Sequence, residues 1–416
     1  MRISVEQLKD IQKKLAILSK DGIVFADDGY LSEEEYDEIP DDLVIDDIGL
    51  EFPDDMDYCH YTVEDFMRYM TEYRSIKRVD RKTVKTKHCL QTVISSSRIG
   101  FYAFQDRLTA FTFSGNGINA RVVSDPFLIG VMNAREHLYD EDFGTGACEP
   151  YWAIEVNSMD EIDLKRAEDL VERICFFLTF KLGVEIYPSE VFDFSQYYEE
   201  MDELYVDDDE AESEESVIDI SSLPHNNPLH KLYRQARGIE NAQIRFLQYY
   251  KVIEQVSIQV AKVAAFGNLM NKIDGLPDVL TDSDLLNPFL AILRDYDTRI
   301  EDDTLASSVI ENCIEVVKLY ELLPARLRKM INANFKSRNT PLIEGSFTDD
   351  QVLSLCKQIG AMLYSTRNRI VHAKANYITK NNEIRDDELD VANELMDTLC
   401  RSIIRWNLKQ PEGFRL

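Results

Sequence analysis

FTDDQVLSLCKQIGAMLYSTRNRIVHAK, residues 347–374, is the stretch whose pattern most clearly predicts a helix. Thr348 stands at the N-cap position and Gln351 follows three residues later, which is the spacing of a capping box. Asp349 and Asp350 lie in the first turn, where the helix dipole favours negative charge. At about 100° per residue one face is apolar, and it comprises Val352, Leu355, Cys356, Ile359, Met362, Leu363 and Ile370.

The opposite face of this helix, expected over 348–373, is built from small and polar side chains. It carries Ser354, Ala361, Ser365, Asn368 and His372, with Arg367 at the edge between the two faces. An ordinary solvated face would show Glu and Lys four residues apart. Because small side chains let a second helix approach closely, we expect this face to pack against a second copy of the chain, giving a homodimer.

The end of the helix has two interpretations. Arg367, Arg369, His372 and Lys374 are cations near a helix C-terminus, where the dipole stabilises them whatever the function. Alternatively, Arg367, Asn368 and His372 spell Arg-Asn-x-x-x-His, which resembles the signature motif of the HEPN superfamily. The resemblance covers about 225–416 and includes a long first helix containing RFLQYYKVIEQVSIQVAK, residues 245–262.

The resemblance implies a helical domain that acts as a ribonuclease in toxin–antitoxin, CRISPR or anti-phage systems. Such domains are understood to work as dimers and to leave a 2′,3′-cyclic phosphate. The residue types fit that chemistry. A histidine near neutrality can move the 2′-hydroxyl proton, and a guanidinium can hold the charge on the phosphate. Asn368 can hold the imidazole or contact the phosphate. Since each chain supplies one such histidine, a two-fold site would provide the second proton-transfer group.

Weaker candidates surround this motif. Glu254 and Tyr250, one turn apart on the first helix, either line the cleft or have ordinary core or surface roles, and Arg369 and Lys374 are further supporting candidates. A basic stretch at 325–339 is a candidate RNA-binding surface, although a solvated face explains it as well; its cations are Arg326, Arg328, Lys329, Lys336 and Arg338. The mechanism requires no metal and no cofactor.

The periodic segments beyond residue 225 are all helical, and the sequence predicts an all-α helical bundle over 225–416. The expected helices cover 240–267, 283–296, 303–334, 348–373 and 386–408. An amphipathic helix is expected at residues 1–20. Period-two segments at 90–97, 98–105, 108–115 and 151–157, a hairpin turn at SGNG (114–117) and a helix at 160–183 predict an α+β domain over 1–196.

Charge separates the two halves of the chain. The net charge is −30, and all of it falls on residues 1–224. Eleven of the seventeen residues from 199 to 215 are acidic, so 197–224 is expected to be a disordered linker. Residues 27–57 carry fifteen carboxylates, which are either a solvated acidic surface or a docking strip for a basic partner. This charge disfavours nucleic-acid binding by the first half.

The cysteines favour a reducing compartment. The seven cysteines are scattered and form no C-x-x-C pair. Cys59-His60 and His88-Cys89 offer the ligand types of a zinc site, but adjacent ligands rarely converge on one ion and the usual short-loop spacing is missing, so no metal site is predicted. The chain shows no apolar run of about 18 residues and no signal peptide, so a cytoplasmic protein without membrane association is expected.

Two functions follow. The first is a metal-independent endoribonuclease in anti-phage defence or as a toxin in abortive infection. Its acidic first half would sense a trigger or restrain the nuclease. The alternative is a non-catalytic, dimeric HEPN-like module that binds a basic protein partner, a trigger or inhibitor, through the acidic half.

Overall fold

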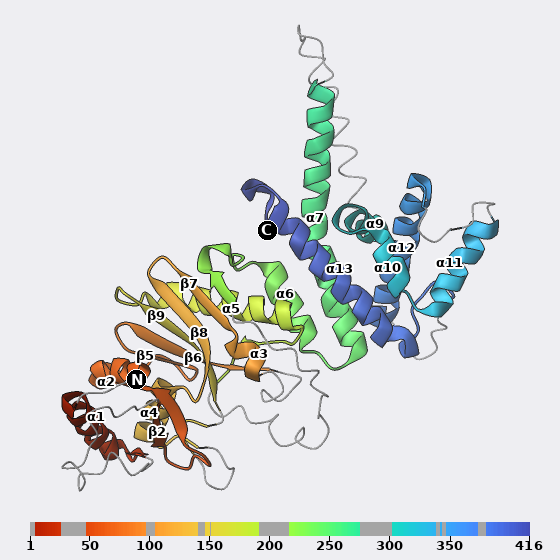
Figure 1. Cartoon of the computed structure of the whole chain (residues 1–416). Coiled ribbons are helices and arrows are strands. Elements are labelled where there is room, and N and C mark those ends of the chain that lie inside the picture. Colours follow the sequence, from red (N-terminus) through yellow and green to blue (C-terminus); the bar gives the residue numbers. More distant parts are fainter. Residues whose placement is uncertain are drawn as a thin grey trace. The chain divides into compact units, whose positions relative to one another are not determined.

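The computed structural model describes residues 5–25, 47–96, 105–139, 146–149, 151–190, 216–274, 302–337, 342, 347–372 and 380–416. It divides into two compact units, residues 1–224 and 225–416 (Figure 1). The first combines helices with β-sheets and the second is helical. The predicted combination of a mixed N-terminal half with a helical C-terminal half is therefore confirmed.

The larger sheet of the first unit is antiparallel except at one edge, where β11 runs parallel to β7. Among the described residues it holds eight strands in the order β11-β7-β8-β9-β6-β5-β4, with β10 also paired to β6. The strands are β4 (Lys77–Arg78), β5 (Thr83–Lys85), β6 (Cys89–Ser95), β7 (Phe111–Gly115), β8 (Ile118–Ser124), β9 (Trp152–Ser158), β10 (Tyr187–Pro188) and β11 (Ser216–Asp219).

The turn between β7 and β8 confirms the predicted hairpin at residues 114–117. Gly115 pairs with Ile118 across the ladder, so Asn116 and Gly117 form the two-residue loop. Their φ angles are 53° and 75°. A two-residue hairpin of this kind needs positive φ at both positions, and Asn-Gly is the pair that adopts it most readily.

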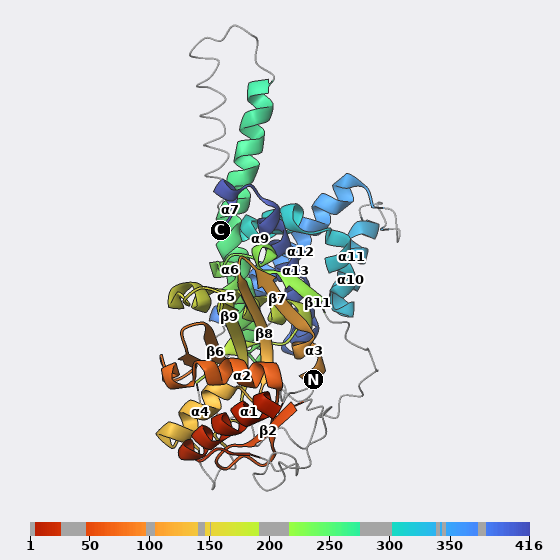
Figure 2. The same ribbon diagram turned by 60° about the vertical axis from the view of Figure 1, so that its left-hand side comes forward.

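The two faces of the larger sheet belong to separate hydrophobic cores. Leu90 and Ile94 of β6 lie in the core covered by α5 (Leu164–Leu182). Cys89 and Val93 alternate with them and face the other core. That second core contains α1 (Val5–Leu18), α2 (Val63–Thr71), α4 (Phe127–Glu136) and a three-stranded sheet of β1 (Val24–Phe25), β2 (Asp47–Glu51) and β3 (Cys59–Thr62), which lie together in Figure 2.

Several predictions for the first half need correction. Residues 216–219 of the expected linker form β11, and Arg173 donates to the carbonyls of Ile220, Leu223 and Pro224. Apolar side chains at 220 and 223 are buried, which offsets the local charge. Residues 105–109 form the short helix α3 (Gln105–Thr109). The predicted strand at 98–104, the linker residues 197–215 and most of the acidic stretch 27–57 lie outside the described residues.

The second unit contains seven helices within the described residues. They are α6 (Pro228–Arg237), α7 (Ala242–Asp274), α9 (Asp302–Cys313), α10 (Val316–Leu322), α11 (Ala325–Ser337), α12 (Asp349–His372) and α13 (Leu389–Lys409). Helix α12 packs on α9, and α7 packs on α6 and α13. The half-buried Asp397 of α13 ties α13 to α6 and α7, because it accepts hydrogen bonds from the hydroxyls of Tyr233 and Tyr249 at 2.9 and 3.2 Å.

Two helix boundaries differ from the sequence prediction. The single helix expected over 303–334 is three helices, α9, α10 and α11. Pro324 lies between α10 and α11, and it accounts for that break because the residue before a proline disfavours helical geometry. Helix α7 continues through Gly267, where the sequence predicted its end. The predicted helix at 283–296 lies outside the described residues. Within the described part of the chain, none of the helices combines the length and apolarity of a membrane span.

Candidate functional site

Helix α12 begins and packs as its sequence predicts. The Thr348 amide donates to the Gln351 side chain at 2.9 Å, and the Gln351 amide donates to the Thr348 hydroxyl at 3.3 Å, which confirms the capping box. Leu355, Ile359 and Leu363 are fully buried. The axis of α12 is thereby fixed, so the direction in which its last turns project is fixed as well.

Arg367 joins the end of α12 to the middle of α7. Its Nη2 lies 3.1 Å from a carboxylate oxygen of Glu254, and its Nη1 donates to the Asn368 side-chain oxygen at 3.0 Å. The side chains of Arg367 and Glu254 are 31% and 43% exposed. Two of the five N–H donors of the guanidinium are therefore engaged, and the remaining donors can meet an anion from solvent.

His372 is the last residue of α12 and is exposed. It follows Asn368 by four residues, so the two side chains share one face of the helix. Within the described residues, the His372 imidazole has no hydrogen-bond or ion-pair partner. An imidazole without a partner at a helix end can accept a proton from a ligand bound there or donate one to it.

Two of the supporting residues have structural roles. Arg369 is 6% exposed; its guanidinium pairs with Asp386 at 2.8 Å and donates to the Ile384 carbonyl at 2.9 Å. It therefore secures the chain that precedes α13, which is a structural role in the fold. Tyr250 lies one turn before Glu254 on α7 but is buried. Lys374 lies outside the described residues.

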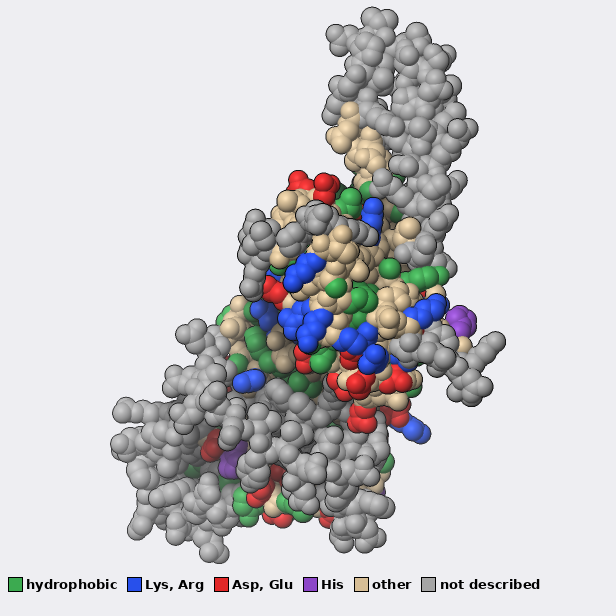
Figure 3. Space-filling model, turned by 90° about the vertical axis from the view of Figure 1, so that its right-hand side faces the viewer, with side chains coloured by type: hydrophobic (Ala, Val, Ile, Leu, Met, Phe, Trp, Pro, Cys, Tyr) green, Lys and Arg blue, Asp and Glu red, His purple; other side chains and the backbone are tan. Residues whose placement is uncertain are grey.

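The predicted RNA-binding stretch separates into two kinds of residue. Arg326 binds both carboxylate oxygens of Glu388 and donates to the carbonyls of Asn381 and Glu383, so its guanidinium is occupied within the fold. Arg328, Lys329 and Lys336 are exposed on α11. Figure 3 shows Lys and Arg side chains gathered on the face of the helical unit that carries α10 and α11. Arg338 lies outside the described residues.

A second polar cluster, centred on Glu155 of β9, was not predicted from sequence. Glu155 is fully buried and accepts from Arg68 at 2.9 Å, Arg121 at 3.2 Å and Gln91 at 2.7 Å, and also from Asn157 and the Tyr69 hydroxyl. Although burial opposes ionisation, Arg121 and Arg68 together with these hydrogen bonds hold the pKa of Glu155 below its usual value. The residues of the Glu155 cluster come from β6, β8, β9 and α2, so no local sequence pattern predicts the cluster.

The Glu155 cluster borders a shallow cleft. A space of about 370 Å³ is lined by both arginines together with Asn119 and Asn157. Asp65 pairs with Arg68 at 2.7 Å and with Arg121 at 2.8 Å. The two arginine charges are balanced by two carboxylates, so the cluster first of all ties α2 to the sheet.

Comparison with known proteins adds no relative. None of the family models, curated proteins or solved structures with which the chain was compared matches it.

Proposed function

We propose that the helical unit is an endoribonuclease of the HEPN type, acting in anti-phage defence or as a toxin. The observation that carries the proposal is the arrangement at the end of α12. Arg367 is oriented by Glu254 and Asn368 at 3.1 and 3.0 Å, and the exposed His372 lies one turn further along the same helix. These are the groups that cleavage of RNA by its own 2′-hydroxyl requires.

The proposed reaction uses only protein groups. The imidazole of His372 removes the proton from the 2′-hydroxyl, which attacks the adjacent phosphate. The free N–H donors of Arg367 contact the phosphate oxygens, where negative charge develops in the transition state. The 5′-oxygen leaves with a proton from a second acid, and the product carries a 2′,3′-cyclic phosphate. The His372 of a second copy supplies that acid.

The exposed face of α12 supports a dimer. Leu353 and Val371 are exposed by 38% and 47% although both are apolar. They are eighteen residues apart, which is five helical turns, so they lie on one line along the helix, and the exposed Ala361 lies on the adjoining small-residue face. A Leu353→Glu change would place a charge on this line and should convert the dimer to a monomer by sedimentation. Ser337→Glu, at the exposed end of α11, is the matched control and should leave the dimer intact.

The charges of the two units suggest how the nuclease is regulated. Residues 1–224 carry the entire net charge of −30, whereas α11 exposes Arg328, Lys329 and Lys336. An acidic segment can compete with RNA for a cationic surface. A basic protein that binds the acidic half would then release the nuclease. Removal of residues 1–224 should raise the cleavage rate if this restraint operates, and an unchanged rate would refute it.

The decisive experiment is cleavage of end-labelled RNA in the presence of EDTA. The wild-type chain should cut and leave a cyclic phosphate, whereas His372→Ala and Arg367→Ala should each lower the rate by at least about a hundredfold. Lys409→Ala, which removes an exposed cation at the end of α13, is the control and should cut at the wild-type rate. Equal cutting by the wild type and the His372 variant would show a contaminating nuclease and refute the proposal.

The alternative is a non-catalytic dimeric module that binds a basic partner. The observation that favours it is the pairing of Arg367 with Glu254, because a guanidinium paired with a carboxylate is a stable structural contact without any ligand. A chain that dimerises through α12 but does not cut RNA would support this function.

A further inference from the structure

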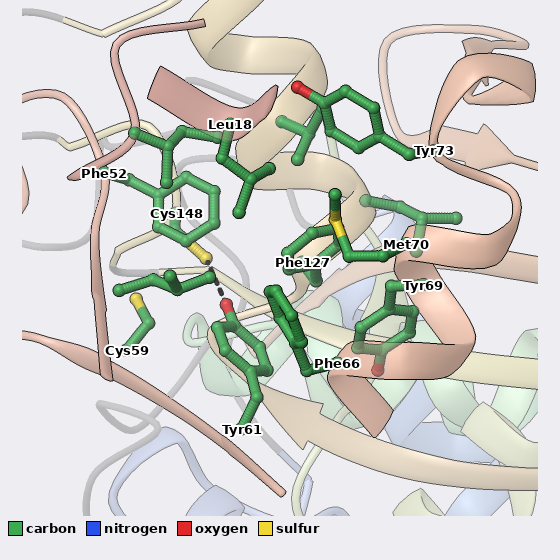
Figure 4. Packing of buried hydrophobic residues seen from close by; sticks show 14 of the residues in the cluster. Leu18, Phe52, Cys59, Tyr61, Phe66, Tyr69, Met70, Tyr73, Phe127 and Cys148 are labelled. Atoms are coloured by element: carbon green, nitrogen blue, oxygen red, sulfur yellow. Dashed lines mark hydrogen bonds between the residues drawn. The ribbon is translucent and has the colours of Figure 1, made fainter. Parts of the chain in front are cut away.

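Asp55, Cys59 and Cys148 bring a carboxylate and two thiols together in the first unit. Their three ligand atoms lie within 4.8 Å of one another. Both cysteine side chains are fully buried. Asp55 lies in the turn between β2 and β3, Cys59 begins β3, and Cys148 comes from the segment 146–149. Figure 4 shows the two cysteines beside Tyr61, whose hydroxyl points to the Cys148 sulfur at 3.4 Å.

Contacts other than the cluster itself hold these groups in place. The Asp55 Oδ1 accepts the amides of Cys148 and Glu149 at 3.0 and 3.2 Å, which leaves Oδ2 facing the Cys59 sulfur at 3.3 Å. In return, the Glu149 carboxylate accepts the Met56 amide at 3.1 Å. A side chain at Gly146 would place its Cβ 1.9 Å from Asp55 Oδ1, so this approach depends on glycine.

Burial opposes ionisation of the side chains in this cluster. Burial raises the pKa of Asp55 to about 6, and burial likewise raises that of the neighbouring Asp125 to about 6. Although contact with Cys148 lowers the pKa of the Cys59 thiol, burial and the Asp55 charge raise it to about 11. Burial also raises the pKa of Cys148.

We propose that Asp55, Cys59 and Cys148 bind a structural Zn²⁺ ion. Two thiolates and one carboxylate form a donor set that suits zinc. Magnesium and calcium prefer sites made only of oxygen ligands. In a tetrahedral zinc site with Zn–S near 2.3 Å, neighbouring ligand atoms lie about 3.5–3.8 Å apart, so small side-chain adjustments suffice. The ion would join the β2–β3 turn to segment 146–149, and one position remains for solvent or a fourth side chain.

This site differs from the arrangement of Cys59-His60 and His88-Cys89 that the sequence presents. His60 pairs with Asp47 at 3.1 Å, and His88 pairs with Glu72 at 2.5 Å. Neither histidine joins Cys59, and the partner thiol comes from 89 residues further along the chain. The zinc site is independent of the proposed ribonuclease, because its ligands all lie in the first unit.

The first test uses the wild-type full chain, purified under reducing conditions. Elemental analysis should find about one zinc per chain after dialysis. Cobalt should replace it and give sulfur-to-cobalt charge-transfer absorption. Alkylation followed by peptide mapping should show Cys59 and Cys148 protected with zinc bound and modified after chelation. A metal-free chain, or a Cys59–Cys148 disulfide formed in place of metal binding, would overturn the proposal.

The second test uses variants. Cys59→Ser and Cys148→Ser should each reduce bound zinc to background, and Asp55→Asn should weaken binding at least tenfold while keeping both thiols. Cys313→Ser, a half-buried cysteine of the helical unit, is the matched control and should keep one zinc. Circular dichroism verifies that each variant is folded. Full zinc occupancy in folded Cys59→Ser or Cys148→Ser protein would equally rule out these ligands.

Discussion

Arg367 on α12 and Glu254 on α7 form an ion pair at 3.1 Å across 113 residues of sequence. The pair positions a guanidinium beside Asn368, and through the shared helix it fixes how that guanidinium lies relative to His372. An Arg-Asn-x-x-x-His motif places three groups on one helix, whereas the orientation of its arginine depends on a second helix.

For the proposed ribonuclease, the Arg367–Glu254 pair predicts separate effects of two substitutions on RNA binding and on turnover. Glu254→Gln keeps an oxygen acceptor but removes a negative charge from the site, so KM for RNA should fall about two- to fivefold with kcat nearly unchanged. Glu254→Ala also removes the acceptor that orients Arg367, so kcat should fall about tenfold or more. Steady-state cleavage kinetics at two salt concentrations measure both effects.

The matched control for these variants is Glu240→Gln, which neutralises an exposed carboxylate just before α7. It should leave both kinetic constants unchanged. If Glu254→Gln and Glu254→Ala behaved alike, orientation of Arg367 by Glu254 would have no part in turnover.

Glu155 should be a determinant of the stability of the first unit. Glu155→Gln leaves Arg68 and Arg121 without their shared buried carboxylate, and loss of one partner from a buried charged group costs about 3 kcal/mol. Urea unfolding measures the loss. Glu161→Gln, an exposed neighbour in sequence, is the control and should change the free energy of unfolding by less than about 0.5 kcal/mol.

The pH dependence of the Glu155 effect follows from the direction of its pKa shift. The folded pKa lies below the unfolded value, so the stabilisation is complete above the unfolded pKa, near 4.3, and is lost as the pH falls through the folded value. The difference between the wild type and Glu155→Gln should therefore shrink under acid conditions. A constant difference down to pH 3 would contradict this account.

Gly360 lies where α12 crosses α9, and we expect that replacing it even with alanine lowers the stability of the helical unit. An added Cβ would lie 2.2 Å from the Ser307 hydroxyl and 2.6 Å from its backbone nitrogen. Because backbone atoms stand in the way, Gly360→Ala should lower the melting temperature and cost about 1–3 kcal/mol. Gly267→Ala on α7 is the control, since its Cβ would meet nothing within 4 Å. That change should stabilise the helix by up to about 1 kcal/mol.

His230 should make the helical unit sensitive to mild acid. Burial lowers its pKa from 6.5 to about 3, so the unfolded chain binds a proton that the folded chain excludes. The neutral histidine is accommodated fully above pH 6.5, and stability should then fall by about 1.4 kcal/mol for each pH unit below it. Urea unfolding of the wild type and His230→Gln at pH 7 and pH 5 measures this slope.

The His230→Gln variant should lose that part of the pH dependence. His225→Gln, which changes an exposed histidine five residues earlier, is the control and should retain the wild-type slope. Identical slopes for the wild type and His230→Gln would show that His230 is protonated in the folded state.

Local patterns predicted several features whose cause lies within a single segment. The capping box at Thr348, the apolar face of α12 and the Asn-Gly turn of the β7–β8 hairpin depend on residues within one or two turns of each other, and the structure confirms them. The break at Pro324 had a local signal in the proline itself, which the predicted helix over 303–334 overlooked. The passage of α7 through Gly267 had none, because a glycine lowers helix stability by only about 1 kcal/mol and does not by itself end a helix.

The sequence by itself determined the helical character of the second half, the acidity of the first and the placement of Asn368 and His372 on one helix face, because periodicity and charge are local properties. Only the tertiary structure decided which carboxylate each of the arginines pairs with. Arg326 and Arg369 are bound to Glu388 and Asp386, while Arg367 meets Glu254. It alone also brought Cys148 beside Cys59 and Asp55 and buried Glu155 between two arginines. These pairings arise from packing between segments that are distant in the sequence, so no spacing along the chain predicts them.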